Sequence, residues 1–242
     1  DLALTTNGVR LEEWALPLRE AGLDRVTVSL DTLSKTVAKR LNGRADSVTR
    51  TLVGIEAARD AGLGVKVNAV IQRGLNTEEI LPLANRFKGS GITLRYIEYM
   101  DVGNCNGWKD KDVVSAEEIL GVLGQVFALE EVPPQYGGEV AKRFRYLDGS
   151  GEIGLVSSVT QPFCGDCSRA RLTADGKLVT CLFAKEGHDL RGALRLGVGD
   201  GELLKIIHAI WGIRSDRYSE RRREMLNRSK PRSKMEMSYV GG

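Results

Sequence analysis

The first hundred residues alternate between short apolar segments of strand type and segments whose apolar residues recur with helical spacing. Strands are expected at 2–6, 26–30, 65–70 and 93–99, and helices at 11–21, 48–58 and 80–87. Asn76 and Glu79 have the spacing of a capping box that would begin the last of these helices. Strands separated by helices of about 10–15 residues form right-handed βαβ units with parallel strands. The pattern therefore predicts an α/β unit built on a parallel sheet.

Polar residues occupy alternate positions near the ends of the four expected strands. They are Thr5, Asn7, Ser29, Asp31, Lys66, Asn68 and Glu98, with Met100 at the next alternate position. Strands covered by helices on both faces are nearly all apolar, whereas residues at the carboxyl ends of strands in a β/α barrel face the catalytic mouth. The pattern favours a closed or partial TIM-type barrel. For Asn7 and Asp31, an ordinary strand-end cap or turn is an equally good explanation. For Lys66 that explanation is weaker, because a charge inside a strand is costly without a ligand or partner.

The pattern changes after residue 100. A loop rich in Gly and Asn is followed by Ser115 and Glu118, a second capping box, which predicts the start of a helix. Two antiparallel hairpins and a last helix are expected further on, in the segments 140–159, 171–181 and 203–211. We therefore divide the chain into a barrel portion, residues 1–100, and an α+β portion, residues 101–242.

Four cysteines are present, and three of them fall close together in the sequence: Cys105, Cys164, Cys167 and Cys181. No secretory signal is visible, and clustered cysteines in such a chain more often bind metal than form disulfides. A structural zinc site needs four ligands, and neither Cys105 nor His188 has the spacing of a zinc ribbon. An iron–sulfur cluster held by three cysteines leaves one iron open to a further ligand. Spacing alone leaves zinc, a cluster and a chance grouping open.

Arg169 and Arg171 follow the second cysteine at alternate positions of an expected strand, which would direct both guanidinium groups to one face. Two planar forks beside a metal centre suit a phosphate-bearing substrate. A solvated hairpin face is the alternative explanation.

The net charge of +3 excludes a histone-like protein. A span of a bilayer takes about 20 apolar residues, and no apolar run in the sequence approaches that length.

The string FCGDCSRARLTADGKLVTCLF, residues 163–183, resembles the C-terminal cluster motif of the radical-SAM GTP cyclases of molybdenum-cofactor biosynthesis, the GTP 3′,8-cyclases. Further motifs resemble this family in its order: LTTNG at 4–8, VSLD at 28–31, VKVNAV at 65–70, RGLN at 73–76 and RYIEYM at 95–100. The final Val240-Gly-Gly242 matches the family's di-glycine tail. The resemblance covers essentially the whole chain and favours the iron–sulfur cluster over zinc.

The resemblance implies a role for each matching residue. Cys164, Cys167 and Cys181 match the ligands of the family's second 4Fe-4S cluster, whose open iron faces the GTP base. Five further positions are implied to bind GTP and two to contact S-adenosylmethionine. The GTP positions are Thr5, Lys66, Arg169, Ala170 and Arg171, and the S-adenosylmethionine positions are Ser29 and Met100. The last two glycines resemble a tail that reaches the active site, and no catalytic side chain is assigned.

The chain departs from the family in one serious respect. The C-x-x-x-C-x-x-C motif of the first cluster is absent, as is a Gly-Gly-Glu-Pro segment, and the chain does not begin with Met. By the resemblance it begins at strand three of six, so we expect a preceding segment, four barrel strands here, and no S-adenosylmethionine cleavage by this polypeptide alone. Ser168 stands where the family usually has Asn, which puts little in doubt.

For the complete protein the resemblance implies a lyase that cyclises GTP to (8S)-3′,8-cyclo-7,8-dihydroguanosine 5′-triphosphate by radical chemistry on the pathway to molybdopterin. Its product would pass to cyclic pyranopterin monophosphate synthase. We expect a cytoplasmic protein without nucleic-acid or membrane partners, and a homodimer is kept open. Two rival hypotheses remain, another radical-SAM enzyme with an auxiliary cluster and a zinc-bound, non-enzymatic barrel relic. The former usually carries more auxiliary cysteines than this chain has.

Overall fold

The computed structural model describes residues 1–222, 224 and 234–239, so the di-glycine tail lies outside the described residues. The chain divides into two compact units. Unit 1 comprises Asp1–Tyr99 and Asp110–Gln161, and unit 2 comprises Met100–Lys109 and Pro162–Gly242. The residues 110–161 thus pack with the N-terminal βαβ segment, while the loop that follows the fourth strand belongs with the C-terminal part.

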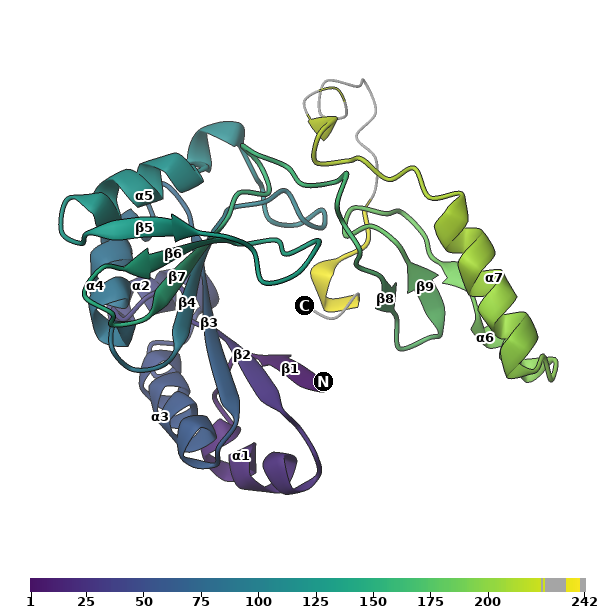
Figure 1. Ribbon diagram of the computed structural model, residues 1–242, viewed down its shortest axis with the longest axis horizontal. Helices are drawn as coiled ribbons and strands as arrows, with labels where there is room; N and C mark the ends of the chain where they lie inside the picture. Colours follow the sequence, from purple (N-terminus) through teal and green to yellow (C-terminus); the bar gives the residue numbers. More distant parts are fainter. Residues whose placement is uncertain (223, 225–233, 240–242) are drawn as a thin grey trace. The chain divides into compact units, whose positions relative to one another are not determined.

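Unit 1 is built on one seven-stranded sheet in the order β1-β2-β3-β4-β7-β6-β5 (Figure 1). Its strands are β1 (Ala3–Thr6), β2 (Arg25–Ser29), β3 (Gly64–Ile71), β4 (Thr93–Glu98), β5 (Leu129–Val132), β6 (Lys142–Tyr146) and β7 (Glu152–Val156). The strands β1 to β4 are mutually parallel, and β7 runs parallel to β4, whereas β5 and β6 are antiparallel to their neighbours. The prediction of an α/β fold with a mostly parallel sheet is confirmed.

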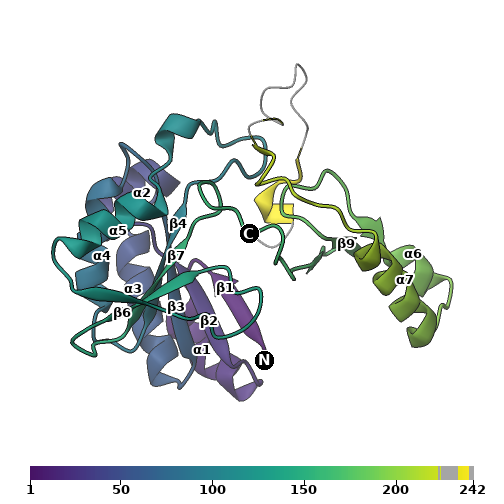
Figure 2. The same cartoon turned by 45° about the horizontal axis from the view of Figure 1, so that its top comes forward.

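Helices cover one face of this sheet, as Figures 1 and 2 show. They are α1 (Leu11–Glu20), α2 (Lys35–Asn42), α3 (Ser47–Asp60), α4 (Ile80–Phe87) and α5 (Ala116–Gly124). Burial alternates along the strands, so that Val67 and Ala69 of β3 lie in the core with Leu94 and Tyr96 of β4. Because side chains alternate between the two faces of a strand, the intervening polar residues lie on the face away from the core. The sheet therefore has one apolar face and one polar face.

Two local signals had different outcomes. The capping box of Ser115 and Glu118 is present and begins α5. The capping box expected at Asn76 and Glu79 is wrong, since Asn76 makes no side-chain capping bond. Its buried amide instead accepts from the backbone N–H of Gln72 and donates to the carbonyls of Asp31 and Val70, each at 2.8 Å. Asn76 therefore holds the loops after β2 and β3 together. The helix α2 and the strand β5 were not among the expected elements.

Asn7 and Asp31, two of the polar residues at strand ends, both accept hydrogen bonds from the backbone. The Asn7 carboxamide oxygen accepts from the backbone N–H of Val9 at 3.2 Å, and the Asp31 carboxylate accepts from that of Val70 at 2.8 Å. Burial raises the pKa of Asp31, against the opposing effect of this hydrogen bond. The Asn7 bond is that of a local turn, whereas Asp31 joins the end of β2 to β3, 39 residues further along the chain.

Glu98, expected at the mouth of a barrel, is instead enclosed. Glu98 is only 1% exposed. Its carboxylate accepts hydrogen bonds from the backbone N–H groups of Ala116, Val159 and Thr160 at 2.7–2.9 Å, and from the Thr160 hydroxyl. Hydrogen bonds to a buried carboxylate are strong because the acceptor is charged. Glu98 therefore ties the end of β4 to the start of α5 and to the segment after β7.

We expect Glu98→Gln to lower the free energy of unfolding by about 1–3 kcal/mol, because at least one buried backbone N–H would lose its acceptor to the new amide nitrogen. Urea denaturation followed by circular dichroism measures the change. The control is Glu117→Gln, an exposed residue of α5, for which we expect a change within about 0.5 kcal/mol. Equal stabilities of the two variants would contradict the anchoring role.

Unit 2 carries a three-stranded antiparallel sheet in the order β10-β9-β8. Its elements are β8 (Arg171–Leu172), β9 (Lys177–Val179), β10 (His188–Asp189), α6 (Arg191–Arg195), α7 (Asp200–Gly212) and a short 3-10 helix, Met237–Tyr239. The expected hairpin turn is present at Asp175-Gly176, where Gly176 has φ +81°. In the described part of the chain, no helix is both long and apolar enough to cross a membrane.

Candidate functional site

The three clustered cysteines lie on neighbouring segments of unit 2. Cys164 and Cys167 share a turn in which the Cys167 N–H donates to the Cys164 carbonyl at 3.4 Å. Cys181 follows β9, so the β8–β9 hairpin returns the chain to this turn, and the Cys164 charge acts on the Cys181 thiol. All three are free and partly buried. Within the described ranges, no three Cys, His, Asp or Glu side chains converge as a metal site requires.

Arginines surround these thiols. The Arg169 guanidinium donates to the Cys167 sulfur from Nε at 3.4 Å and from Nη2 at 3.3 Å, and Arg214 donates to the Cys167 carbonyl. Burial opposes ionisation of the Cys167 thiol, but the hydrogen bonds and charge of Arg169, with Arg214, outweigh it and lower its pKa. Burial raises the pKa of the Cys181 thiol. The surroundings thus favour the thiolate, the form that binds metal, at Cys167 and oppose it at Cys181.

The donor set fits a cysteine-ligated cluster in its chemistry. Once deprotonated, the three cysteines would supply soft sulfur ligands, and the neighbouring arginines would offset their negative charge. The fourth cysteine, Cys105, is exposed and its thiol donates to the Glu236 carboxylate at 3.6 Å. His188 is exposed on β10. The structure thus gives Cys105 a partner of its own.

Arg169 and Arg171 differ in their contacts. Arg169 is exposed, and its guanidinium lies 5.1 Å from the ring centroid of Phe163. Arg171 begins β8 and is half-buried, and burial together with repulsion by Arg169 lowers its pKa. The two cations are therefore close enough to repel one another, and an anion between them would relieve that repulsion. The exposed Ala170 separates them without adding bulk.

In unit 1, the strand register aligns the expected ligands in two rows. Thr5 of β1 pairs with Thr27 of β2, which pairs with Lys66 of β3. Directly paired residues of neighbouring strands point to the same face of a sheet. Thr5 and Lys66 therefore share the polar face. Burial and the charges of Arg95 and Arg25 lower the pKa of Lys66.

The second row contains Arg95, a residue that the sequence analysis did not single out. Ser29 pairs with Asn68, which pairs with Arg95, and the Arg95 Nε donates to the Asn68 carboxamide oxygen at 2.8 Å. Burial lowers the pKa of Arg95. Arg95 stands two residues after Thr93, which pairs with Lys66, so its side chain lies on the same face of the sheet as Lys66. This alternation is the sequence signal by which Arg95 could have been found. Lys66 and Arg95 thus form a half-buried cationic pair.

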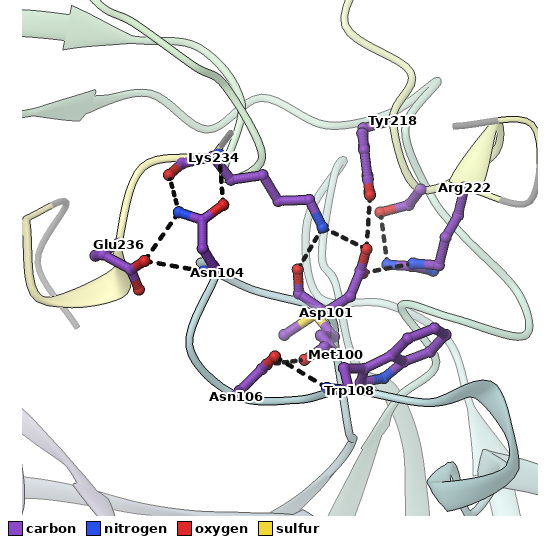
Figure 3. A network of polar contacts seen from close by, with 10 residues as sticks. Met100, Asp101, Asn104, Asn106, Trp108, Tyr218, Arg222, Lys234 and Glu236 are labelled. Carbon is purple, nitrogen blue, oxygen red and sulfur yellow. Dashed lines mark hydrogen bonds and ion pairs between the residues drawn. The ribbon is translucent and has the colours of Figure 1, made fainter. Parts of the chain in front are cut away.

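A hollow of about 450 Å³ lies beyond the ends of β1 and β2 in unit 1. Its lining includes Ser29, Asn7 and Asp31, together with Arg44 and Ser47 near the start of α3. Met100, the other residue expected to contact S-adenosylmethionine, begins the loop of unit 2, where its carbonyl accepts from the Asn106 amide at 3.0 Å (Figure 3). The expected site residues are therefore divided between the two units.

Comparison with known proteins gives the relationship directly. The family model described as Molybdenum Cofactor Synthesis C matches residues 92–220, and that of the Radical SAM superfamily matches residues 1–87. The chain is 47% identical to a GTP 3′,8-cyclase of Xanthomonas axonopodis pv. citri, covering 100% of this chain and 71% of the relative. It is 48% identical to that of Acidothermus cellulolyticus and 44% identical to that of Staphylococcus aureus, covering 73% and 72% of those relatives and 100% of this chain. The chain belongs to the GTP 3′,8-cyclase family of the radical SAM superfamily.

Proposed function

We propose that the protein catalyses the radical-SAM cyclisation of GTP in molybdenum-cofactor biosynthesis, with this chain supplying the cluster- and GTP-binding part. The observation that carries the proposal is the 44–48% identity to GTP 3′,8-cyclases over the full length of this chain. The arginine-surrounded cysteines of unit 2 and the cationic pair of unit 1 support it, because a nucleoside triphosphate needs both base recognition and charge neutralisation.

Cys164, Cys167 and Cys181 would hold a 4Fe-4S cluster. When bound by three thiolates, such a cluster supplies an iron with an open coordination position that can take a ligand atom of the guanine base. The hydrogen bonds and charge of Arg169 lower the pKa of the Cys167 thiol, which makes its thiolate, the form that binds metal, easier to form. Arg169 and Arg214 compensate the charge of the thiolates and hold the peptide at Cys167 in place.

The phosphates of GTP would be bound by Arg169 and Arg171 in unit 2 and by Lys66 in unit 1. Arginine forks match phosphate oxygens in a bidentate manner, whereas lysine acts as a point charge. The half-buried cations Lys66 and Arg95 repel one another. A bound phosphate would offset that repulsion and so stabilise the charged form of both side chains. Thr5, on the same row as Lys66, offers a hydroxyl as a further donor.

The finer architecture and the remaining partners belong to the same proposal. The polar face of the sheet in unit 1 would form the inner wall of a partial β/α barrel, with Ser29 and Met100 contacting S-adenosylmethionine. A first 4Fe-4S cluster would cleave that cofactor, and its ligands are not among the cysteines of this chain. The cyclised nucleotide would pass to cyclic pyranopterin monophosphate synthase, in a cytoplasmic setting, and a homodimer is the assembly to test.

The test is nucleotide binding by the anaerobically reconstituted protein, measured by equilibrium dialysis at fixed, moderate salt. We expect GTP to bind about tenfold or more tightly than ATP, a difference in binding free energy of about 1.4 kcal/mol. The two nucleotides differ only in the base, and the open iron of the proposed cluster would take a ligand atom of guanine. Removal of the cluster should reduce this preference while leaving weak, base-independent phosphate binding.

Two results would contradict the proposal. One is equal affinity for the two nucleotides with the cluster in place. The other is zinc without acid-labile sulfide in the purified protein, which would favour the zinc-bound relic. Iron and sulfide in equal amounts support the cluster.

A further inference from the structure

The segment Lys234–Tyr239 lies against the loop Met100–Lys109 of the same unit (Figure 3). One side chain of this loop, Asn104, pairs with both main-chain groups of Lys234. Its amide oxygen accepts from the Lys234 N–H at 2.9 Å, and its amide nitrogen donates to the Lys234 carbonyl at 2.6 Å. An Asn that satisfies both groups of one residue fixes the direction of that backbone as a neighbouring strand would.

The side chain of Lys234 enters a buried ionic network. Its ammonium donates to the Asp101 carboxylate and to the Asp101 carbonyl, both at 2.6 Å. Tyr218 and Arg222 donate to the same carboxylate at 2.6 and 2.7 Å. The side chains of Asp101, Lys234 and Arg222 are only 5%, 10% and 4% exposed. Such a network holds its members in one geometry, because a charge left without its partner in the interior is costly.

Glu236 occupies a fitted position on the loop. Its carboxylate accepts from the backbone N–H and the side-chain amide of Asn104, each at 2.9 Å. Gly103 has φ +64°, and a Cβ there would lie 2.2 Å from the Glu236 carboxylate. The left-handed backbone conformation favours glycine here, and a Cβ would displace the Glu236 carboxylate from its position on the loop. These hydrogen bonds lower the pKa of Glu236, so it is ionised at neutral pH.

The same segment also contacts the hairpin that carries Cys181. The Met235 N–H donates to the Ala184 carbonyl at 3.0 Å, and the Ala184 N–H donates to the Cys181 carbonyl at 3.1 Å. The Tyr239 hydroxyl helps to lower the pKa of Asp175 in the β8–β9 turn. The segment 234–239 thus spans from the loop to the cysteine-bearing hairpin, and we call it the strap.

We propose that the strap holds the Cys181 side of the hairpin against the loop Met100–Lys109, with Asp101 and Asn104 as the positioning residues that fasten it. The polypeptide near Cys181 is then fixed by contacts from both ends of unit 2. A fixed Cys181 retains metal better than a mobile one. This last consequence rests on the proposed function, whereas the fastening of the strap does not.

Trypsin tests the fastening. Cleavage after Lys234 requires its side chain to leave Asp101, so the intact protein should release the peptide 235–242 slowly relative to cleavage after Arg44, an exposed residue between α2 and α3. In Asp101→Asn and Asn104→Asp, we expect release of this peptide to accelerate about tenfold or more, because proteolysis follows local opening. Asp110→Asn, at an exposed carboxylate, is the matched control and should leave the rate unchanged.

A double variant separates a direct contact from a general loss of structure. Asn104→Asp places a second carboxylate beside Glu236, and Glu236→Gln supplies an amide that can donate to it. Asn104→Asp combined with Glu236→Gln should therefore recover part of the protection lost in Asn104→Asp alone. A non-specific defect at residue 104 would not be rescued by a change 132 residues away. Asn104 is exposed, so these variants fold even where Asp101→Asn does not.

The consequence for the metal is read as iron release to a chelator from the reconstituted protein. We expect release to be about tenfold faster in Asn104→Asp than in the native chain, and the double variant to be intermediate. If trypsin released the peptide 235–242 as slowly from Asn104→Asp as from the native protein, the proposed fastening of the strap would be wrong. Lost protection with an unaltered rate of iron release would overturn its support of Cys181. A native protein that binds no iron but shows the expected trypsin pattern would overturn the cluster assignment and leave the fastening of the strap established.

Discussion

Replacement of any one of Cys164, Cys167 or Cys181 with Ala is expected to abolish the visible iron–sulfur absorbance of the anaerobically reconstituted protein. With three thiolates, the proposed cluster already has one iron without a protein ligand, and loss of a second ligand leaves the cubane held by only two. The effect should be the same for all three positions, because each supplies one ligand. Absorbance spectra with iron and sulfide analysis measure it.

Cys105→Ala is the matched control. The Cys105 thiol is exposed and donates to Glu236 at 3.6 Å, while that carboxylate keeps its two stronger hydrogen bonds from Asn104. We therefore expect an unchanged spectrum in this variant. Bleaching of the Cys105→Ala protein, or a native spectrum after any of the other three replacements, would show that the assigned ligand set is wrong.

Replacement of Arg169 or Arg171 with Ala is expected to weaken GTP binding by about one to two orders of magnitude. A hydrogen bond between charged groups contributes about 1.5–3 kcal/mol, which corresponds to this range of affinity. Lys at either position should recover only part of the loss, since it offers a point charge and no planar fork. Equilibrium dialysis at fixed salt gives the affinities, because screening weakens exposed charge pairs.

The contacts of Arg169 require one further control. Because Arg169 lowers the pKa of Cys167, its removal raises that pKa, so the variants are compared at equal cluster content. Arg171 bears no such bond to Cys167 among the contacts described above, which makes Arg171→Ala the cleaner test. Arg195→Ala, an exposed arginine on α6, should bind GTP as the native protein does. Unaltered GTP affinity in both Arg169→Ala and Arg171→Ala would exclude the phosphate role and favour a solvated hairpin face.

Local sequence signals were sufficient wherever neighbouring residues decide the structure. The alternation of apolar strands and helical stripes predicts the parallel sheet, and Asp175-Gly176 predicts the turn between β8 and β9. Ser115 and Glu118 predict the start of α5 because both partners of a capping box lie within one turn. The helix α2 buries only Ala38, although Ser34 caps its start and Gly43 ends it in the left-handed conformation, so its local signals lay in the caps and not in an apolar stripe.

The roles of several polar residues were decided only by tertiary structure. Asn76 resembles a helix cap in sequence, yet its amide is satisfied by the carbonyl of Asp31, 45 residues away. Glu98 resembles a residue at a barrel mouth, yet its carboxylate accepts from backbone groups up to 62 residues distant. A buried polar group needs a hydrogen-bond partner, but the sequence nearby does not say which partner the fold will supply.

The sequence by itself determined most of the strand–helix order, the cysteine spacing and the family, but not the helix α2 or the strand β5. It contained no local sign of the strap, whose fastening joins Asp101 and Asn104 to residues 130–133 positions away. Periodicity and capping are patterns among residues close together in the sequence, whereas the residues that fasten the strap are brought together only by the tertiary fold. Folding removes Asp101 and Lys234 from water and brings their charged groups to 2.6 Å. Because an unpaired charge in the interior would be costly, the tertiary structure alone decides that these two residues pair.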